Sequence, residues 1–329
     1  MEGQAKYGCG MIANPPPRLT DEQVQASFLP NGCLQQQLAC NGCCNPASSP
    51  GVPSSDGTCC YVFCERSCCG RPFIVDGRQQ LANLASRGDW LQAFAAAPPG
   101  SLDARIAGEW LEDARMEHAS IASFARFTLD LLAFGAPPEL LELAQRAALE
   151  EVEHARLCFG LAARYGAADY GPGPLEVAEV RVAASLWDAA LSAFDEGCVG
   201  ETLAAFQALA ALELATDPEV RRTLAQIAEQ EAAHAELAWR FVSWSAARLG
   251  PELARVLERR LAERPIARDA THEVEHPDAI AALHAAGRLT DADKQRVTLA
   301  GLRDLVEPCV RALADSARAG CAEGRTIGA

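Results

Sequence analysis

The chain has 329 residues and a formal net charge of −15, with 44 acidic residues against 29 basic ones. An acidic chain of this kind repels a phosphate backbone, so the charge argues against nucleic-acid binding and favours a small-molecule or peptide substrate. The sequence holds no run of about 18 uncharged apolar residues, so we expect no transmembrane segment.

Residues 1–75 form a cysteine-rich segment, with ten of the 14 cysteines lying between Cys9 and Cys69. The segment has too few aliphatic residues to bury a core, so cross-links must hold it together. Doublets such as Cys43-Cys44 and irregular gaps favour disulfides. The single Cys40-x-x-Cys43 unit leaves metal ligation open as the alternative.

The compartment stays open on these observations. Disulfides imply an oxidising, extracytoplasmic or cell-envelope location. The start of the chain as given, Met1 to Lys6, lacks the apolar core of a signal peptide.

Residues 76–100 are expected to be a connector. A short strand ending in a turn is predicted for 71–77 and a helix for 81–94, and Pro98-Pro99-Gly100 then breaks the chain.

Apolar residues at helical spacing predict four long helices within residues 101–250. Ser101 is the expected cap of the first helix, and Pro138 and Asp217-Pro218 open the second and the fourth. The expected ranges are about 102–133, 138–165, 188–215 with further helix from 175, and 218–249. Residues 251–329 are predicted to be a helical extension, with short helices near 251–263, 278–286 and 291–316. Tight connections within each pair of long helices, and a long segment between the pairs, predict an all-α four-helix bundle with one long crossover.

An internal repeat carries the chemistry. Pro138 is followed thirteen residues later by Glu151-x-x-His154, and Pro218 is followed thirteen residues later by Glu231-x-x-His234. A Glu and a His three residues apart lie on one face of a helix and can reach the same point.

Each half of the repeat also has a glutamate on the preceding helix. Glu117 lies 34 residues before Glu151, and Glu201 lies 30 residues before Glu231. The two separations differ by about one helical turn, which keeps the same side facing inward. We therefore expect four carboxylates and two imidazoles to converge between the helices.

Four carboxylates buried together require cations, because each charge is costly to desolvate and the charges repel one another. Two divalent ions cancel four negative charges. Hard oxygen ligands with one imidazole per metal suit iron, or manganese, better than zinc or copper.

This pattern, a Glu followed one helical hairpin later by acidic-Glu-x-x-His and occurring twice, resembles the ferritin-like non-haem di-iron oxygenases. The p-aminobenzoate N-oxygenases are one such family, and rubrerythrins and tRNA hydroxylases share the scaffold. The resemblance covers residues 101 to about 249 and implies a ferritin-like fold. It implies six metal ligands: Glu117, Glu151, His154, Glu201, Glu231 and His234.

The resemblance further implies that Glu151 and Glu201, or Glu117 and Glu231, bridge the metals. The residue before each motif glutamate is acidic in the family and hydrogen-bonds the opposite histidine. Here that residue is Glu150 in one half but Gln230 in the other. A glutamine can still accept a hydrogen bond from a ring N–H.

Other residues near the motifs, and one further motif, have simpler interpretations. His118 points about 100° away from Glu117 around the helix, which favours a surface or supporting role. Cys158 and Cys198 lie one turn from motif residues, where a packed core thiol is the simpler interpretation. The stretch from His272 to His276 matches the zinc-protease pattern His-Glu-x-x-His, but Pro277 follows at once, so an exposed linker is expected.

The sequence thus predicts a di-iron oxidoreductase that activates dioxygen for hydroxylation, N-oxygenation or desaturation. Such an enzyme needs an external electron donor. A homodimer is compatible with this prediction. Two alternatives remain open. One is a ferroxidase or iron-handling protein, and the other is a metal-stabilised scaffold that carries a cysteine-rich binding module.

Overall fold

The structure is a computed structural model that describes residues 7–10, 52–53, 59–62, 70–75, 78–264 and 276–323, with side chains for 70–75, 78–264 and 276–316. The chain divides into two compact units. The first comprises Met1–Cys68 and Ile74–Gln79, and the second comprises Cys69–Phe73 and Gln80–Ala329. The disulfides predicted between Cys9 and Cys69 lie outside the side chains that the structure describes.

The first unit contains short antiparallel strands. β1 (Tyr7–Gly10) and β2 (Val52–Pro53) both pair with β3 (Cys59–Val62), which lies between them. β4 (Ile74–Val75) pairs with β5 (Arg78–Gln79), so a short strand forms within the range where the sequence predicts one, and the predicted turn at 76–77 lies outside the described residues.

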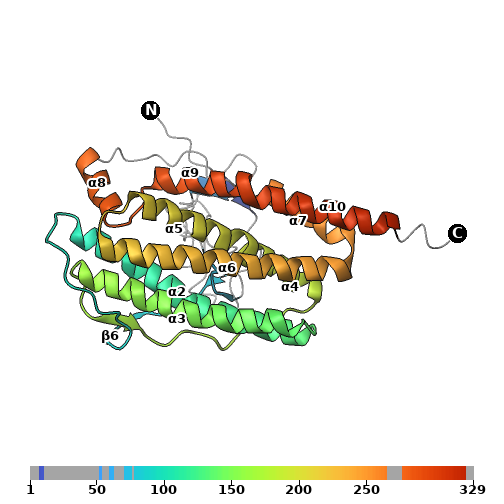
Figure 1. The fold of residues 1–329 in the computed structure, drawn as a ribbon, viewed down its shortest axis with the longest axis horizontal. Helices are drawn as coiled ribbons and strands as arrows, with labels where there is room; N and C mark the ends of the chain where they lie inside the picture. The colour runs from blue at the N-terminus through green and yellow to red at the C-terminus, as the bar shows by residue number, and fades with distance from the viewer. Residues whose placement is uncertain are drawn as a thin grey trace. The chain divides into compact units, whose positions relative to one another are not determined.

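The second unit is mostly helical (Figure 1). Its strands are β6 (Leu84–Ser86) and β7 (Tyr170–Pro172), which pair antiparallel. Its α-helices are α2 (Asp103–Ala133), α3 (Pro138–Arg164), α4 (Leu186–Ser192), α5 (Thr202–Leu214), α6 (Pro218–Leu249), α7 (Pro251–Ala262), α8 (Pro277–Ala285), α9 (Asp291–Gly301) and α10 (Glu307–Glu323). Two π-helical segments, η1 (Ala193–Glu201) and η2 (Leu302–Val306), join α4 to α5 and α9 to α10.

Two helical hairpins form the centre of this unit. α2 packs along α3, α6 packs along η1 and α5, and α3 contacts α6 (Figure 1). The C-terminal helices lie on the second hairpin, with α9 against α5 and α10 against α7 and α6. The long helices begin and end within a few residues of the predicted positions. Asp217 caps α6 by accepting a hydrogen bond from the backbone N–H of Glu219 at 2.9 Å.

Three local predictions are wrong. The helix predicted for 81–94 is instead extended chain, because β6 pairs with β7 and the backbone N–H of Gln92 donates to the carbonyl of Arg156. A single short helix is marginal in water, and Gly88 weakens it further. The helix predicted to resume at 175 begins only at Leu186, after Ser185 caps it. Ser101 is not a cap; the N-cap of α2 is Leu102, which makes no side-chain capping bond.

The third long helix runs from Leu186 to Leu214 and includes the π-helical segment η1. Among the described helices, this one alone is apolar and long enough to cross a membrane by length and composition. A core helix passes the same test, and 56% of its most apolar stretch is buried.

The buried apolar side chains form two clusters along the helices. One cluster contains Phe124, Phe194 and Phe241, and the other contains Trp110, Phe159 and Ile227. In each of α2, α3 and α6, the residues of one apolar cluster lie toward one end of the helix and those of the other cluster toward the opposite end. A short polar stretch lies between them. Five of the six predicted ligands occupy these polar stretches, and the sixth, Glu201, lies in η1.

Candidate metal centre

The structure brings together all six residues predicted as ligands. They form two overlapping groups, and within each group the ligand atoms lie within 4.8 Å of one another. The first group is Glu117, Glu151, His154 and Glu231; the second is Glu151, Glu201, Glu231 and His234.

Four helical elements supply these side chains. Glu117 lies in α2, Glu201 is the last residue of η1, and the two Glu-x-x-His motifs lie in α3 and α6. Because residues three apart share a helix face, each motif presents its carboxylate and its imidazole to the same interior point.

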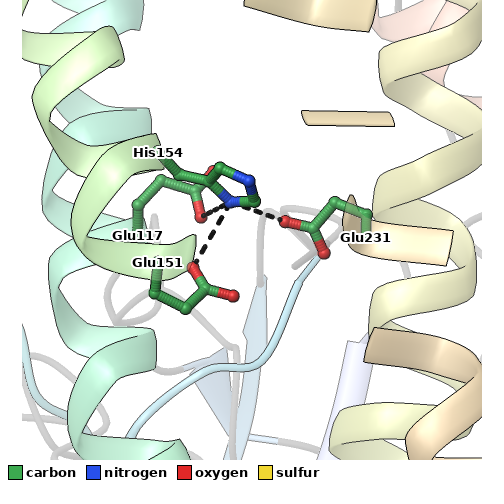
Figure 2. Close-up of side chains that lie close together, drawn as sticks. All are labelled: Glu117, Glu151, His154 and Glu231. Atoms are coloured by element: carbon green, nitrogen blue, oxygen red, sulfur yellow. Dashed lines mark ion pairs between the residues drawn. The ribbon is translucent and has the colours of Figure 1, made fainter. Parts of the chain in front are cut away.

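Figure 2 shows the first group, with three carboxylates directed at the ring of His154. The Nδ1 atom of His154 lies 3.3 Å from Oε1 of Glu231, 3.7 Å from Oε2 of Glu151 and 3.8 Å from Oε2 of Glu117. Three oxygens around one ring nitrogen at these distances are an arrangement that could hold a cation.

The second group has the same design around His234. Its Nδ1 atom lies 3.2 Å from Oε1 of Glu151 and 3.8 Å from Oε2 of Glu231. The two carboxylates common to both groups are therefore Glu151 and Glu231. This pair differs from both expected bridging pairs and takes one carboxylate from each. The reason is that the motif glutamates of α3 and α6 are the ones that lie near both imidazoles.

The outer nitrogen of each imidazole is held by the helix opposite. Nε2 of His154 lies 2.9 Å from Oε1 of Gln230, and Nε2 of His234 lies 2.8 Å from Oε2 of Glu150. Both partners are acceptors, so each Nε2 carries the proton and donates it. The prediction that Gln230 can accept a hydrogen bond from a ring N–H is confirmed. The Nδ1 atom of each ring is left facing the carboxylates, where a metal would bind.

The inward-facing atoms of the centre lack hydrogen-bond partners within the described part of the chain. They are both carboxylate oxygens of Glu151 and Glu201, one of Glu231, and the Nδ1 atoms of His154 and His234. So many unpaired polar atoms are rarely buried together in a protein, because each one has a desolvation cost. Divalent cations would satisfy all of them.

In the metal-free chain, protons take up part of this charge. Burial alone lowers the pKa of His234, but the carboxylates of Glu150 and Glu151 outweigh it and raise that pKa to about 9. The pKa of His154 is likewise held well above its usual range by Glu117, Glu151 and Glu231, against the effect of burial.

The carboxylates respond in opposite directions. Burial raises the pKa of Glu201 well above its usual range, and the neighbouring charges of Glu231 and Glu151 add to the rise. Burial also raises the pKa of Glu117. Burial would raise the pKa of Glu151 too, but the attraction of the nearby imidazoles of His154 and His234 outweighs burial and lowers it. The centre thus holds protons where a cation could replace them.

Arg71 is a neighbour that sequence reasoning missed. Its side chain is buried between the rings of Phe124 and Phe127, with its guanidinium carbon 4.5 Å from each centroid. Its Nε lies 3.9 Å from Glu196, and its charge lowers the pKa of Glu201, against the larger effect of burial. An isolated arginine near the end of a cysteine-rich segment carries no sequence signal of such a position.

The other candidates lie outside both groups. The ring of His118 packs edge-on against Trp90 at 5.2 Å. Cys158 and Cys198 are buried free thiols, and burial raises the pKa of each well above its usual range. Of the His-Glu-x-x-His stretch, residues 272–275 lie outside the described residues. His276 is exposed and caps α8.

Comparisons of the chain with protein-family models, with curated proteins and with solved structures find no significant match. The buried cluster of Glu and His side chains is therefore the feature of this chain that bears on its chemistry.

Proposed function

We propose that α2, α3, α6 and the helix formed by η1 and α5 make a ferritin-like four-helix bundle whose centre binds two iron ions, with manganese as the alternative metal. We further propose that the chain is an oxidoreductase that uses dioxygen to oxidise a small molecule or peptide, with electrons from an external donor.

The observation that carries this proposal is the set of buried ligand atoms without partners. Five carboxylate oxygens and two imidazole nitrogens face one interior volume, and each is free of hydrogen bonds within the described residues. Two divalent cations would balance the four carboxylates in charge. A set rich in oxygen, with one imidazole for each metal, favours iron or manganese over zinc or copper.

When bound, two iron ions would supply the reduction of dioxygen. The residues of the chain prepare the place for it. Glu151 and Glu231 would bridge the two positions, because each belongs to both groups. Hydrogen bonds from the Nε2 atoms fix the two rings, and apolar clusters pack on either side of the centre.

Loss of metal on substitution tests the centre. We expect Glu151→Ala and His234→Ala each to bind fewer than two iron ions per chain, because the first removes a shared carboxylate and the second removes an imidazole. Metal content of the purified chain, measured by elemental analysis after anaerobic loading with Fe²⁺, gives the result.

Glu153→Gln is the matched control. Glu153 lies on the same turn of α3, but it is exposed and accepts a hydrogen bond from Gln226. This variant should keep two irons. Two irons retained in both Glu151→Ala and His234→Ala would refute the assignment.

Oxygen uptake tests the reaction separately. The ferrous protein should consume dioxygen, and the two ligand variants should not do so above the rate of free Fe²⁺. A wild-type chain that binds two irons and leaves dioxygen untouched would overturn the oxidoreductase proposal while the metal centre stands.

A further inference from the structure

The two halves of the centre share two carboxylates but differ in the partner behind each histidine. His154 is backed by the side-chain amide of Gln230, and His234 is backed by the carboxylate of Glu150. The two hydrogen bonds are nearly equal in length, at 2.9 and 2.8 Å, so the difference lies in charge rather than in geometry.

This difference acts directly on the metal-binding nitrogen. A carboxylate that accepts the Nε2 proton draws it away from the ring and raises the basicity of Nδ1. A neutral amide oxygen does so less. Nδ1 of His234 should therefore be the stronger ligand of the two.

The remaining carboxylates differ as well. The side chain of Glu117, which belongs to the first group alone, is 19% exposed, whereas Glu201, which belongs to the second group alone, is 0% exposed. Attraction between a cation and a carboxylate is stronger where water is excluded. Water can compete for the cation at Glu117 but not at Glu201.

Arg71 acts against this trend, because its positive charge is felt at Glu201. Glu196 lies 3.9 Å from Nε of Arg71 but is paired more closely with Arg126, at 2.6 Å, so it offsets only a small part of the charge of Arg71. Neither oxygen of Glu201 forms a hydrogen bond among the described residues, whereas Glu150 contacts its histidine directly. The hydrogen bond between Glu150 and His234 is direct, whereas the repulsion between Arg71 and a cation at Glu201 acts over a longer distance. We therefore expect the hydrogen bond to have the larger effect on metal affinity.

We infer that the two metal positions are unequal: the position formed with His234 and Glu201 binds its divalent cation first and more tightly, and the position formed with His154 and Glu117 fills second. This inference rests on the proposed metal centre. Since a supporting partner of a metal-bound histidine typically alters metal affinity about 10- to 100-fold, we expect the two dissociation constants to differ by roughly that factor.

A titration of the full metal-free chain with Mn²⁺ tests the order of filling. Free Mn²⁺ is followed by electron paramagnetic resonance and the heat of binding by calorimetry. The wild-type chain should bind one equivalent tightly and a second about 10 to 100 times more weakly.

The reciprocal variants Glu150→Gln and Gln230→Glu separate charge from structure. The first should weaken the tight step, and the second should tighten the weak step, so that the two constants converge in either variant. A purely structural role for these side chains would weaken binding in both variants and tighten it in neither. Glu153→Gln should leave both steps unchanged.

The outcomes distinguish the inference from the function on which it rests. A wild-type chain that binds neither Mn²⁺ nor Fe²⁺ overturns the metal centre and this inference with it. A chain that binds two Mn²⁺ ions with equal affinity, or whose steps ignore both reciprocal variants, overturns the inequality alone.

Discussion

The imidazole of His234 shows how strongly the centre demands positive charge. In the folded metal-free chain its pKa is about 9, against 6.5 for an ordinary histidine; burial alone would lower it, and Glu150 and Glu151 more than compensate. A raised folded-state pKa adds stability that is complete below about pH 6.5 and is lost as the pH rises through about 9. The raised pKa values of His154, Glu117 and Glu201 act in the same direction.

We therefore expect the free energy of unfolding of the metal-free chain to fall as the pH rises from about 6.5 to about 9, by on the order of 3 kcal/mol from His234 alone. Urea unfolding in the presence of a chelator, followed by circular dichroism, measures this. His276, which is exposed on α8, offers the control variant His276→Gln, which should keep the same slope. A stability that stays constant or rises over this range would contradict the protonated centre.

The grouping of the site residues could be predicted from sequence because it follows from helix geometry. The two Glu-x-x-His motifs lie at the same distance from the proline that begins each helix, so their side chains come together when the helices pack. Other features depend on three-dimensional packing. Which carboxylates lie near both imidazoles, and the burial of Arg71 between two phenylalanines, have no periodic signature.

The π-helical segment η1 is the element that sets the position of Glu201. Within η1, Gly197 packs against α6, where a Cβ atom would lie 2.4 Å from the Cβ of Ala238. Gly200 accepts a hydrogen bond on its carbonyl from Gly70, and a Cβ there would lie 2.3 Å from the Gly70 carbonyl oxygen. No real contact is that short, so these positions require glycine while the backbone stays in place.

Gly197→Ala should therefore lower the free energy of unfolding by about 1–3 kcal/mol, the usual cost of an overpacked core. It should also weaken metal binding, because a shift of η1 moves Glu201. Gly108→Ala is the matched control, since Gly108 is an exposed helical glycine of α2 with nothing within 4 Å of an added Cβ. That variant should gain about 0.5–1 kcal/mol. Equal effects of the two substitutions would show that helix propensity, and not packing, governs η1.

The elements differ in whether nearby residues in the sequence are enough to predict them. α3 and α6 begin at Pro138 and Pro218 as predicted, because a proline at a first helical turn is a local cue. The stretch 81–94 has the composition of a helix but pairs with residues far along the chain, and composition carries no record of such pairing. A π-helical segment leaves no periodic pattern of its own, so the sequence gives no sign of η1.

At the scale of the whole helical unit, a polar centre separates two apolar clusters. Those clusters can pack without a cation, but the partnerless carboxylates between them oppose folding. Any cation that binds only the folded chain shifts the equilibrium toward it. At a free concentration 100 times the dissociation constant, one site adds about 2.7 kcal/mol. Thermal unfolding with Mn²⁺ against a chelator should therefore show a higher midpoint, and His234→Ala should reduce the gain.

The pH dependence of that gain has a definite sign. A metal ion can bind Nδ1 only after the imidazole has lost its extra proton, so metal affinity rises with pH as His154 and His234 lose theirs. The metal-free chain is destabilised over the same interval, because those protons were holding its centre together. We therefore expect the stabilisation by Mn²⁺ to grow steadily from about pH 6.5 to about 9, so that the two stability curves diverge. Curves that run parallel would mean that the cation binds elsewhere, since only a cation that replaces these protons couples the two equilibria.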